Sequence, residues 1–526
     1  MELLEISQSD VLSWIVFLPL LGALVLVFVP GRRLNVLRMF AFLIAAADFI
    51  LSLSLPANFI LGTHEMQFVV SRPWIERWGV SYHLGIDGIS LFLVLLTTLL
   101  SPVAILSTWS AIREKVKGFM ILILVLECGM LGAFVSLDMV LFYVFWEVML
   151  LPMYLLIGVW GHEKRVYAAV KFILYTVLGS LLMLVGFIYL FWIGSQSLGY
   201  MTTDLLELYR VAVPYHAQLW LFLSFALAFA IKVPVFPFHT WLPDAHVEAP
   251  TAGSVILAAI LLKMGAYGFI RFAMPLFPAA SEAFAPLIMI LGVIGIIYGA
   301  LVAMVQPDLK KLVAYSSVSH LGYVMLGLYS LTVSGVSGGI FQMLSHGLST
   351  GALFLIVGIL YERRHTRQID QFGGLSARMP VFAFFFMIAT LSSIGLPGLN
   401  GFVGEFLVFI GLYGSAHSSF VYFAATGMIL SAVYMLWMFR RVMFGPLENP
   451  QNANLSDLNW REILVFLPLV VMMFWMGLFP RPFLARMEPS VSYFIEQYQT
   501  KSHLAEADRL QEADSLAAHE QPPGQK

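Results

Sequence analysis

The stretch Ala228-Phe-Ala-Ile-Lys232-Val-Pro-Val-Phe-Pro237 places one lysine and two prolines inside an otherwise apolar segment. Proline removes a backbone donor and interrupts a helix, so this segment is predicted to be a helix that breaks just after Lys232. A second apolar segment is punctuated in the same way, because Gly395-Leu-Pro-Gly398 precedes Glu405. Within a bilayer, such breaks are tolerated only where protein or a polar cavity encloses the freed backbone. The two segments therefore predict two broken helices inside a membrane protein.

The composition of the whole chain favours the same fold class. Hydrophobic residues make up 60% of the 526 positions and charged residues only 11%. A membrane-spanning helix needs about 20 mostly apolar residues, and the sequence contains about fourteen such segments. We therefore expect an all-α polytopic membrane protein with about fourteen transmembrane helices, of which the seventh and twelfth are broken.

An equal spacing between polar residues suggests an internal repeat. Lys232 and Glu405 differ by 173 positions, as do Glu147 and His320. Discontinuous helices at corresponding places in two halves are typical of inverted repeats. The predicted divisions are three N-terminal helices in residues 1–110, a first five-helix repeat in 111–275, a second inverted repeat in 276–445, a loop and last helix in 446–498, and a polar, flexible tail in 499–526.

The basic residues indicate an orientation in the membrane. Most of them fall in the odd-numbered connections between spans, which should be cytoplasmic, and an even number of spans then puts both termini on the periplasmic side. The start, Met1 to Asp10, lacks the basic region of a secretory signal, so we expect Val11 to Val29 to be retained as the first span. A bacterial inner membrane is the expected location.

Three charged residues lie deep within apolar spans: Glu147, Lys232 and Lys263. A charge at the bilayer centre costs about 2.5 kcal/mol or more, so such residues normally face the bundle interior and serve ion transfer. Burial disfavours the charged form and a nearby opposite charge favours it, so a Glu–Lys pair can act as a proton switch when its separation changes. The structural alternatives are a packed, neutral carboxylate for Glu147 and structural ion pairs for the two lysines.

Three further residues extend this polar series along the chain. His320 and His346 stand in adjacent spans, and imidazole passes protons through either nitrogen near neutral pH. Glu405 follows the second helix break. The alternatives are hydrogen-bonded core histidines and, for Glu405, a carboxylate that caps the helix at the break. The predicted proton-transfer residues are therefore Glu147, Lys232, Lys263, His320, His346 and Glu405.

Other polar positions carry weaker signals. Glu127 is a candidate to assist Glu147, and Asp87 is as well explained as a cap of the third span. The polar loop His239-Thr-Trp-Leu-Pro-Asp-Ala-His246-Val-Glu-Ala-Pro250 fits either a cytoplasmic access route or a turn with satisfied side chains. The single cysteine, Cys128, excludes an intrachain disulfide and a four-cysteine metal site. We expect no metal, flavin or nicotinamide site in this chain, and the nearly balanced charge argues against nucleic-acid binding.

Three long motifs resemble the antiporter-like subunits of NADH:quinone oxidoreductase, respiratory complex I. They are the run from His239 through Lys263 to Gly268, the run from Gln306 to His320, and the run from Leu396 to Phe406. The resemblance extends over nearly all of the expected spans. Glutamate at position 405, and a chain without a long helix after the last span, are usual features of one of the three subunit types in that family.

The resemblance implies two inverted five-helix repeats and one proton channel through Glu147, Lys232, Lys263 and Glu405, with His320 and His346 linking them. The implied partners are the other membrane subunits of the complex, including two related antiporter-like subunits, and the lipid bilayer. FMN and iron–sulfur clusters are expected in partner subunits and no cofactor in this chain. Two alternatives stay open, namely a subunit of a multisubunit Na⁺/H⁺ antiporter and a membrane scaffold that translocates nothing.

Overall fold

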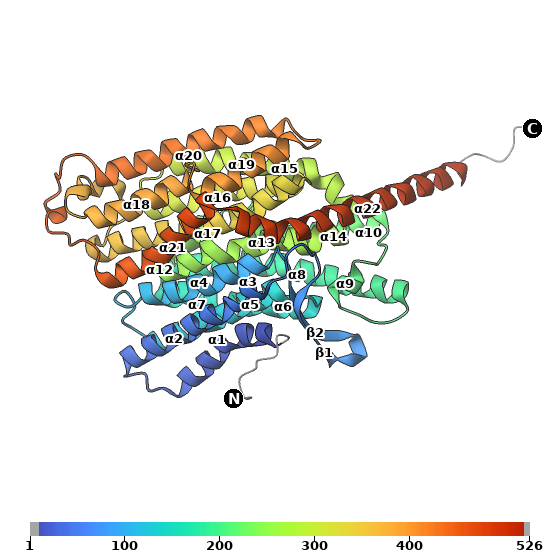
Figure 1. Cartoon of the computed structure of the whole chain (residues 1–526), viewed down its shortest axis with the longest axis horizontal. Coiled ribbons are helices and arrows are strands. Elements are labelled where there is room, and N and C mark those ends of the chain that lie inside the picture. The colour runs from blue at the N-terminus through green and yellow to red at the C-terminus, as the bar shows by residue number, and fades with distance from the viewer. Residues whose placement is uncertain (1–9, 520–526) are drawn as a thin grey trace, which may run out of the picture.

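A computed structural model describes the backbone of residues 10–519 and the side chains of residues 10–502. The acidic start of the chain up to residue 9, and residues 520–526, lie outside the described part. Apolar helices run side by side through most of the molecule (Figure 1), and eleven of those described are long and apolar enough to cross a membrane. The predicted polytopic membrane fold, built mostly of helices, is confirmed, whereas the exact number of spans and the inverted repeat stay predictions.

The first part of the chain combines membrane-length helices with one β-hairpin. Its elements are α1 Val11–Phe28, α2 Leu34–Ser52, α3 Ser54–Asn58, β1 Gln67–Ile75, η1 Glu76–Trp78, β2 Val80–Ile86, α4 Leu91–Ser107, α5 Val116–Val135, α6 Met139–Val148, α7 Leu150–Trp160, α8 Arg165–Leu198 and α9 Leu205–Leu208.

All regular elements in the rest of the described chain are helices, and both helix breaks lie among them. Its elements are α10 Tyr215–Lys232, α11 Trp241–Glu248, α12 Thr251–Ile256, η2 Leu257–Leu261, α13 Leu262–Gly268, η3 Phe269–Ala273, α14 Met274–Leu276, α15 Pro278–Met304, α16 Leu309–Tyr329, α17 Val333–Arg364, η4 Ile369–Gln371, η5 Leu375–Ala377, α18 Pro380–Ser393, α19 Asn400–Tyr413, α20 Phe420–Met443, η6 Pro450–Asn452, α21 Trp460–Leu478 and α22 Arg481–His519.

Both predicted breaks lie where the prolines and glycines place them. Helix α10 ends at Lys232 and the chain resumes helical geometry at Trp241, while α18 ends at Ser393 and α19 begins at Asn400. The indole of Trp241 donates to the Ile231 carbonyl at 2.9 Å, so a side chain satisfies an acceptor that the end of α10 leaves free. The first break is therefore partly hydrogen-bonded, as membrane depth requires.

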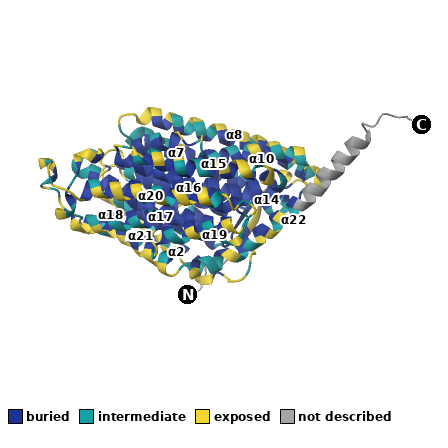
Figure 2. Cartoon of the chain, turned by 90° about the horizontal axis from the view of Figure 1, so that it is seen from above, coloured by how far each residue is buried: buried dark blue, intermediate teal, exposed yellow. Residues whose placement is uncertain are grey.

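Two spans are enclosed on all sides by the rest of the protein. The most apolar windows of residues 251–276 and of α17 are buried completely, whereas α8 and α20 expose much of their surface. Figure 2 shows the same distribution, with buried residues along the interior and exposed residues along outer helices such as α8. Polar side chains on the enclosed spans can only meet other protein groups.

The hairpin β1–β2 was not predicted from the sequence. Its strands pair antiparallel, with Ser71 opposite His83 and Pro73 opposite Ser81. Gly79 turns the chain with φ +62°, and a Cβ there would lie 2.0 Å from the Met201 carbonyl oxygen, so only glycine fits. Asp138, which caps α6, also accepts from the Ser81 amide at 3.0 Å. The hairpin thus fixes one end of the helix that carries Glu147.

The sequence did not predict the long helix that follows the last span and continues into the region expected to be a polar tail. Helix α22 has 39 residues, continues to His519 and projects beyond the helical body (Figure 1). Its polar second half is rich in Ala and Leu, which have high helix propensity. Its first half is anchored, because Tyr498 donates to the Pro278 carbonyl at 3.1 Å and Lys501 to the Pro275 carbonyl at 3.1 Å.

Candidate functional site

The two enclosed spans meet through a lysine and a histidine. Lys263 of α13 donates to Nδ1 of His346 on α17 at 2.6 Å and to the Ala258 carbonyl at 2.6 Å, and both side chains are buried. A π-helical segment, η2, directly precedes α13, and such widened turns are frequent at functional sites. A hydrogen bond between a lysine and an imidazole nitrogen is a direct path for a proton.

A second buried group forms around Glu405 on α19. Its Oε1 lies 3.2 Å from Nδ1 of His320 on α16, and the Gln342 amide of α17 donates to the same oxygen at 3.2 Å. The hydroxyl of Ser393, the last residue of α18, lies 3.2 Å from Nε2 of His320. Both nitrogens of His320 therefore have polar partners, and Glu405 binds a histidine instead of capping its own helix.

The second helix break makes room for this carboxylate. Gly395 has φ +75°, which strains residues other than glycine, and a Cβ there would lie 3.0 Å from Oε2 of Glu405. That oxygen has no hydrogen-bond partner among the described residues. The glycine in the break thus holds open the approach to the acid.

The two groups are neighbours. The rings of His320 and His346 have centroids 5.8 Å apart, and the buried Nε2 of His346 lacks a hydrogen-bond partner among the described residues. The structure therefore brings together four of the six predicted residues, in the order Lys263, His346, His320 and Glu405. Each comes from a different helix.

Glu147 and Lys232 form a separate part of the site. The Lys232 ammonium is buried, lies 5.2 Å from the Trp146 ring centroid and 5.6 Å from that of Phe172, and has no hydrogen-bond partner among the described residues. Glu147 acts on it electrostatically, but no described ion pair joins the two. Glu147 is only half-buried, although one carboxylate oxygen is enclosed without a partner. The predicted pair is thus adjacent but open.

No hydrogen bond among the described residues joins Lys232 to Lys263. Their helices nevertheless pack closely, because a Cβ on Gly265 of α13 would lie 2.8 Å from the Val233 amide and 2.6 Å from the Phe229 carbonyl oxygen. Lys232 precedes Val233 directly. The backbones that carry the two lysines are therefore in contact, and the gap lies between their side chains.

His246, which on sequence grounds fits either an access route or a turn, lies near Lys263 and Lys310. Its ring is fully buried, stacks on Phe354 with centroids 4.5 Å apart, and has no hydrogen-bond partner for either nitrogen among the described residues. Lys310 and Lys263 are the charged groups that act on it. In a turn with satisfied side chains, the ring nitrogens of His246 would have hydrogen-bond partners. The signal was present in the sequence as a histidine just after the first break.

The sequence did not single out Gln342 and Ser393, which contact Glu405 and His320 in the structure. Gln342 precedes His346 by four residues and therefore shares its helix face, so the spacing contained that information. Ser393 has no comparable signal, because its contact with His320 spans 73 positions.

The weaker candidates have partners outside the six predicted residues. Glu127 on α5 is buried next to Asp48 on α2, and none of the four carboxylate oxygens has a hydrogen-bond partner among the described residues. Asp87 caps the start of α4 through the amides of Ile89 and Ser90, and it also pairs with Arg271 at 2.5 Å. The described residues contain no group of three or more metal-ligating side chains.

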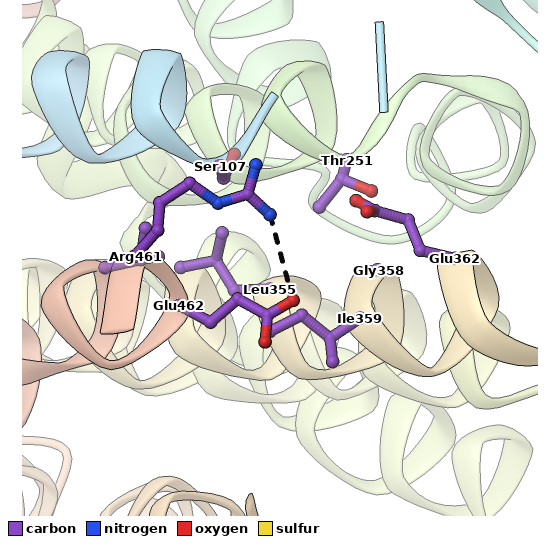
Figure 3. Close-up of a pocket in the computed structure, with 9 residues that line it drawn as sticks. Ser107, Thr251, Leu355, Gly358, Ile359, Glu362, Arg461 and Glu462 are labelled. Atoms are coloured by element: carbon purple, nitrogen blue, oxygen red, sulfur yellow. Dashed lines mark ion pairs between the residues drawn. The ribbon is translucent and has the colours of Figure 1, made fainter. Parts of the chain in front are cut away.

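A small cavity lies near the C-terminal end of α17. Ser107, Thr251, Glu362, Arg461 and Glu462 line it (Figure 3), and Arg461 and Glu462 form an ion pair at 3.8 Å. Its volume of about 10 Å³ is just enough for one water molecule. Glu362 is held by the Ser110 hydroxyl at 2.8 Å.

Comparison with known proteins identifies relatives over almost the whole chain. The profile of a family described as NADH:quinone oxidoreductase/Mrp antiporter, transmembrane, matches residues 136–474. The NADH-quinone oxidoreductase subunit M of Rhodobacter capsulatus is 47% identical over 510 residues, covering 93% of this chain and 97% of that protein. A chain of respiratory complex I from Thermus thermophilus with bound NADH superposes with a TM-score of 0.84 at 33% identity, covering 93% of this chain and 99% of the other.

A third relative shares the fold alone. A chain of the Mrp complex from Dietzia sp. DQ12-45-1b superposes with a TM-score of 0.80 at 20% identity, covering 94% of this chain and 99% of the other.

Proposed function

Because this chain belongs to the NADH:quinone oxidoreductase/Mrp antiporter membrane-subunit family, we propose that it is a proton-translocating membrane subunit of a respiratory NADH:quinone oxidoreductase. Within the family its similarity is to subunit M. The observation that carries the proposal is the buried series Lys263, His346, His320 and Glu405. Hydrogen bonds join the first two residues at 2.6 Å and the last two at 3.2 Å, and the two histidine rings between them have centroids 5.8 Å apart. Buried ionisable residues in membrane spans are costly, and proton relays are their usual role.

The proton transfer follows from the atoms in contact. Lys263 donates to Nδ1 of His346, so neutral His346 carries its own proton on Nε2. When Lys263 passes a proton to Nδ1, the resulting imidazolium releases the Nε2 proton towards His320. His320 then hands a proton from Nδ1 to Oε1 of Glu405. Each step moves a proton between neighbouring groups without moving a helix.

Glu147 and Lys232 are the switch in this proposal. A buried ammonium without a hydrogen-bond partner depends on a nearby carboxylate for stabilisation. When Glu147 approaches, Lys232 keeps its proton, and when Glu147 withdraws, the proton is released towards Lys263. The open geometry of the pair supports this role, because a permanent ion pair could not respond. His246, next to Lys263, is the group that supplies protons from the Lys310 side.

The redox chemistry belongs to partner subunits in this proposal. FMN and iron–sulfur clusters there carry electrons from NADH to quinone, and the related antiporter-like subunits lie beside this one in the membrane. The complex resides in a bacterial inner membrane with both chain ends periplasmic. Asp10, the residue before α1, pairs with Arg72 of the hairpin, and Gly88, just after the hairpin, donates to Ser490 of α22. These contacts support placing the start of α1 and α22 on the same side of the membrane.

The Na⁺/H⁺ antiporter remains the second candidate, because the Mrp chain shares the fold. The 47% identity to an NADH-quinone oxidoreductase subunit favours the redox-coupled function. A pure scaffold is disfavoured by the unsatisfied polar atoms of the site, because structural buried groups are normally hydrogen-bonded.

The proposal is tested by measuring proton pumping and NADH–quinone activity in membranes that carry Glu147→Gln or Lys232→Ala, with assembly confirmed on a native gel. We expect both activities to fall at least tenfold in fully assembled complexes, because about 1.4 kcal/mol of lost coupling gives that factor. Glu76→Gln, in the exposed turn of the hairpin, is the matched control. Unchanged pumping in both variants would contradict the proposal and favour a scaffold that translocates nothing. Sodium-dependent exchange without redox coupling would instead favour an antiporter subunit.

A further inference from the structure

An apolar cavity of about 290 Å³ lies on the other side of α17 from the proton-transfer residues. Its walls come from α2, α4, α17, α21 and the start of α22. The lining residues include Leu95 and Leu99 of α4, Leu348 of α17, Met472 and Trp475 of α21, and Phe483 of α22. Water finds too few polar partners in such a space, and an empty space forfeits dispersion contacts along its whole lining. The cavity is suited to an apolar occupant.

One charged residue stands in this lining. Arg486 of α22 donates to the Pro482 carbonyl at 2.8 Å and to the Pro56 carbonyl at 3.2 Å. Its Nε is buried without a hydrogen-bond partner, and none of the described ion pairs includes it. An uncompensated guanidinium with a free N–H beside an apolar cavity is complementary to an anion that carries a hydrocarbon chain.

The cavity opens to the surface of the bundle. Leu53 and Trp475 in its wall are 46% and 48% exposed, and both lie on helices of the membrane region. A lipid can therefore enter sideways from the bilayer. The main chain near Arg486 is fixed, because a Cβ on Gly88 would lie 1.9 Å from the Arg486 carbonyl oxygen and the Gly88 amide donates to Ser490 at 3.0 Å. The arginine is thus held at one end of the cavity.

We propose that this cavity binds one anionic phospholipid, with its phosphate on Arg486 and an acyl chain between α4, α17 and α21. Basic pockets between transmembrane helices are known to select anionic headgroups. The acyl chain packs against Leu344 and Leu348, which flank His346 in the sequence of α17. The lipid therefore packs against the face of α17 opposite His346. This inference does not depend on the proposed direction or role of proton transfer.

The test is photolabelling of the assembled complex in nanodiscs of phosphatidylcholine that contain phosphatidylglycerol with a diazirine in its acyl chain. We expect label on peptides from α4 and α21, removed by excess unlabelled phosphatidylglycerol and unaffected by excess phosphatidylcholine. Arg486→Gln should lower the labelling at least fivefold, and Arg486→Lys should restore part of it. Arg481→Gln, an exposed arginine of the same helix outside the cavity, should leave the labelling unchanged.

A second pair of variants separates the cavity from the headgroup. Leu95→Trp fills the cavity while keeping Arg486, and should lower the labelling as strongly. Ile50→Trp, on the exposed face of α2, should not. Equal labelling by a phosphatidylcholine probe, labelling that survives both Arg486→Gln and Leu95→Trp, or crosslinks from the cavity to a neighbouring subunit or to a photoreactive quinone would each overturn the proposal. Pumping activity does not enter the readout, so a failure here is distinct from a failure of the proposed function.

Discussion

At the scale of single residues, several of the buried polar atoms without partners belong to the proposed proton-transfer residues. Buried polar groups in stable proteins are normally hydrogen-bonded, yet Lys232 Nζ, His346 Nε2, Glu405 Oε2 and both nitrogens of His246 are not paired within the described residues. These atoms lie along the proposed path. A group that must accept and release a proton cannot have every partner fixed, so the unsatisfied atoms are consistent with transfer and poorly explained by structure alone.

Gly395→Ala tests the space beside Glu405. The added Cβ meets Oε2 at 3.0 Å and the residue must hold φ +75°, which costs about 1–2 kcal/mol for an L-residue. We expect pumping to fall several-fold in an assembled complex, because Glu405 is displaced from His320. Proton uptake measured with a pH-sensitive dye in membrane vesicles checks this expectation.

The control for that variant is Gly445→Ala. Gly445 also has a positive φ, of +94°, but a Cβ there meets nothing within 4 Å. It therefore reproduces the backbone strain without touching the site. Equal losses in the two variants would attribute the effect to strain and not to Glu405.

Glu127→Gln tests whether the Asp48–Glu127 pair belongs to the path. Two enclosed carboxylates without partners repel each other and lack hydrogen bonds, whereas the amide introduced by this change can donate to Asp48. We expect the subunit to become more stable by about 1 kcal/mol, seen as a higher thermal unfolding midpoint, with pumping retained. A loss of pumping as large as that of Glu147→Gln would instead place Glu127 in the path.

At the scale of helices and connections, the breaks in α10–α11 and α18–α19 have different consequences. The first break begins directly after Lys232, so the lysine lies on the last turn of α10. Trp241, at the other end of this break, donates a hydrogen bond to the Ile231 carbonyl. The second precedes Glu405 and brings Ser393 and Gly395 next to the acid and its histidine. One break positions a base at a helix end, and the other makes space around an acid.

The connection between α7 and α8 gives a pH prediction. Burial lowers the pKa of His162 to about 4, and Lys310 and Arg367 contribute in the same direction. In the unfolded chain a histidine titrates near 6.5. The stabilisation from neutral His162 is therefore present above pH ~6.5 and is lost as the pH falls towards ~4, because the unfolded chain binds the proton first. We expect the thermal midpoint to drop less between pH 7.5 and 5 in His162→Gln than in the wild type.

A second histidine serves as the comparison for this pH effect. His417 lies in the connection between α19 and α20, away from Lys310 and Arg367 in the sequence. His417→Gln should keep the pH dependence of the wild type. If both substitutions flatten the dependence equally, the effect is not specific to His162.

For the whole molecule, α22 joins regions that are far apart in the sequence. Its first half binds the start of α4 through Ser490 and the start of α15 through Tyr498, and its far half projects from the body (Figure 1). A chain that ends after Ser502 keeps these contacts, whereas one that ends after Ser490 loses those of Tyr498 and Lys501. We expect normal amounts of assembled complex on a native gel for the first and a clear reduction for the second. Equal amounts would show that α22 is dispensable for assembly.

The sequence by itself determined the class of fold, the breaks and the chemistry available. The backbone hydrogen bonds of a long apolar segment in a bilayer are satisfied when the segment is a helix. Prolines and glycines interrupt such helices, and a charged residue such as Lys263 in an apolar span must face the interior of the protein. These properties are local, so a window of neighbouring residues contains them. The resemblance of three motifs to a known family added the expected function, and the comparisons agree with it.

Only the tertiary structure decided which polar groups meet. Lys263 and His346 are 83 positions apart, and His320 and Glu405 are 85. The same packing places Glu127 beside Asp48, keeps Glu147 and Lys232 adjacent but unpaired, and leaves a cavity next to Arg486. The physical reason is that contacts between helices depend on how whole side-chain surfaces interlock. Spacing along one helix does not encode the rotation and depth of its neighbours.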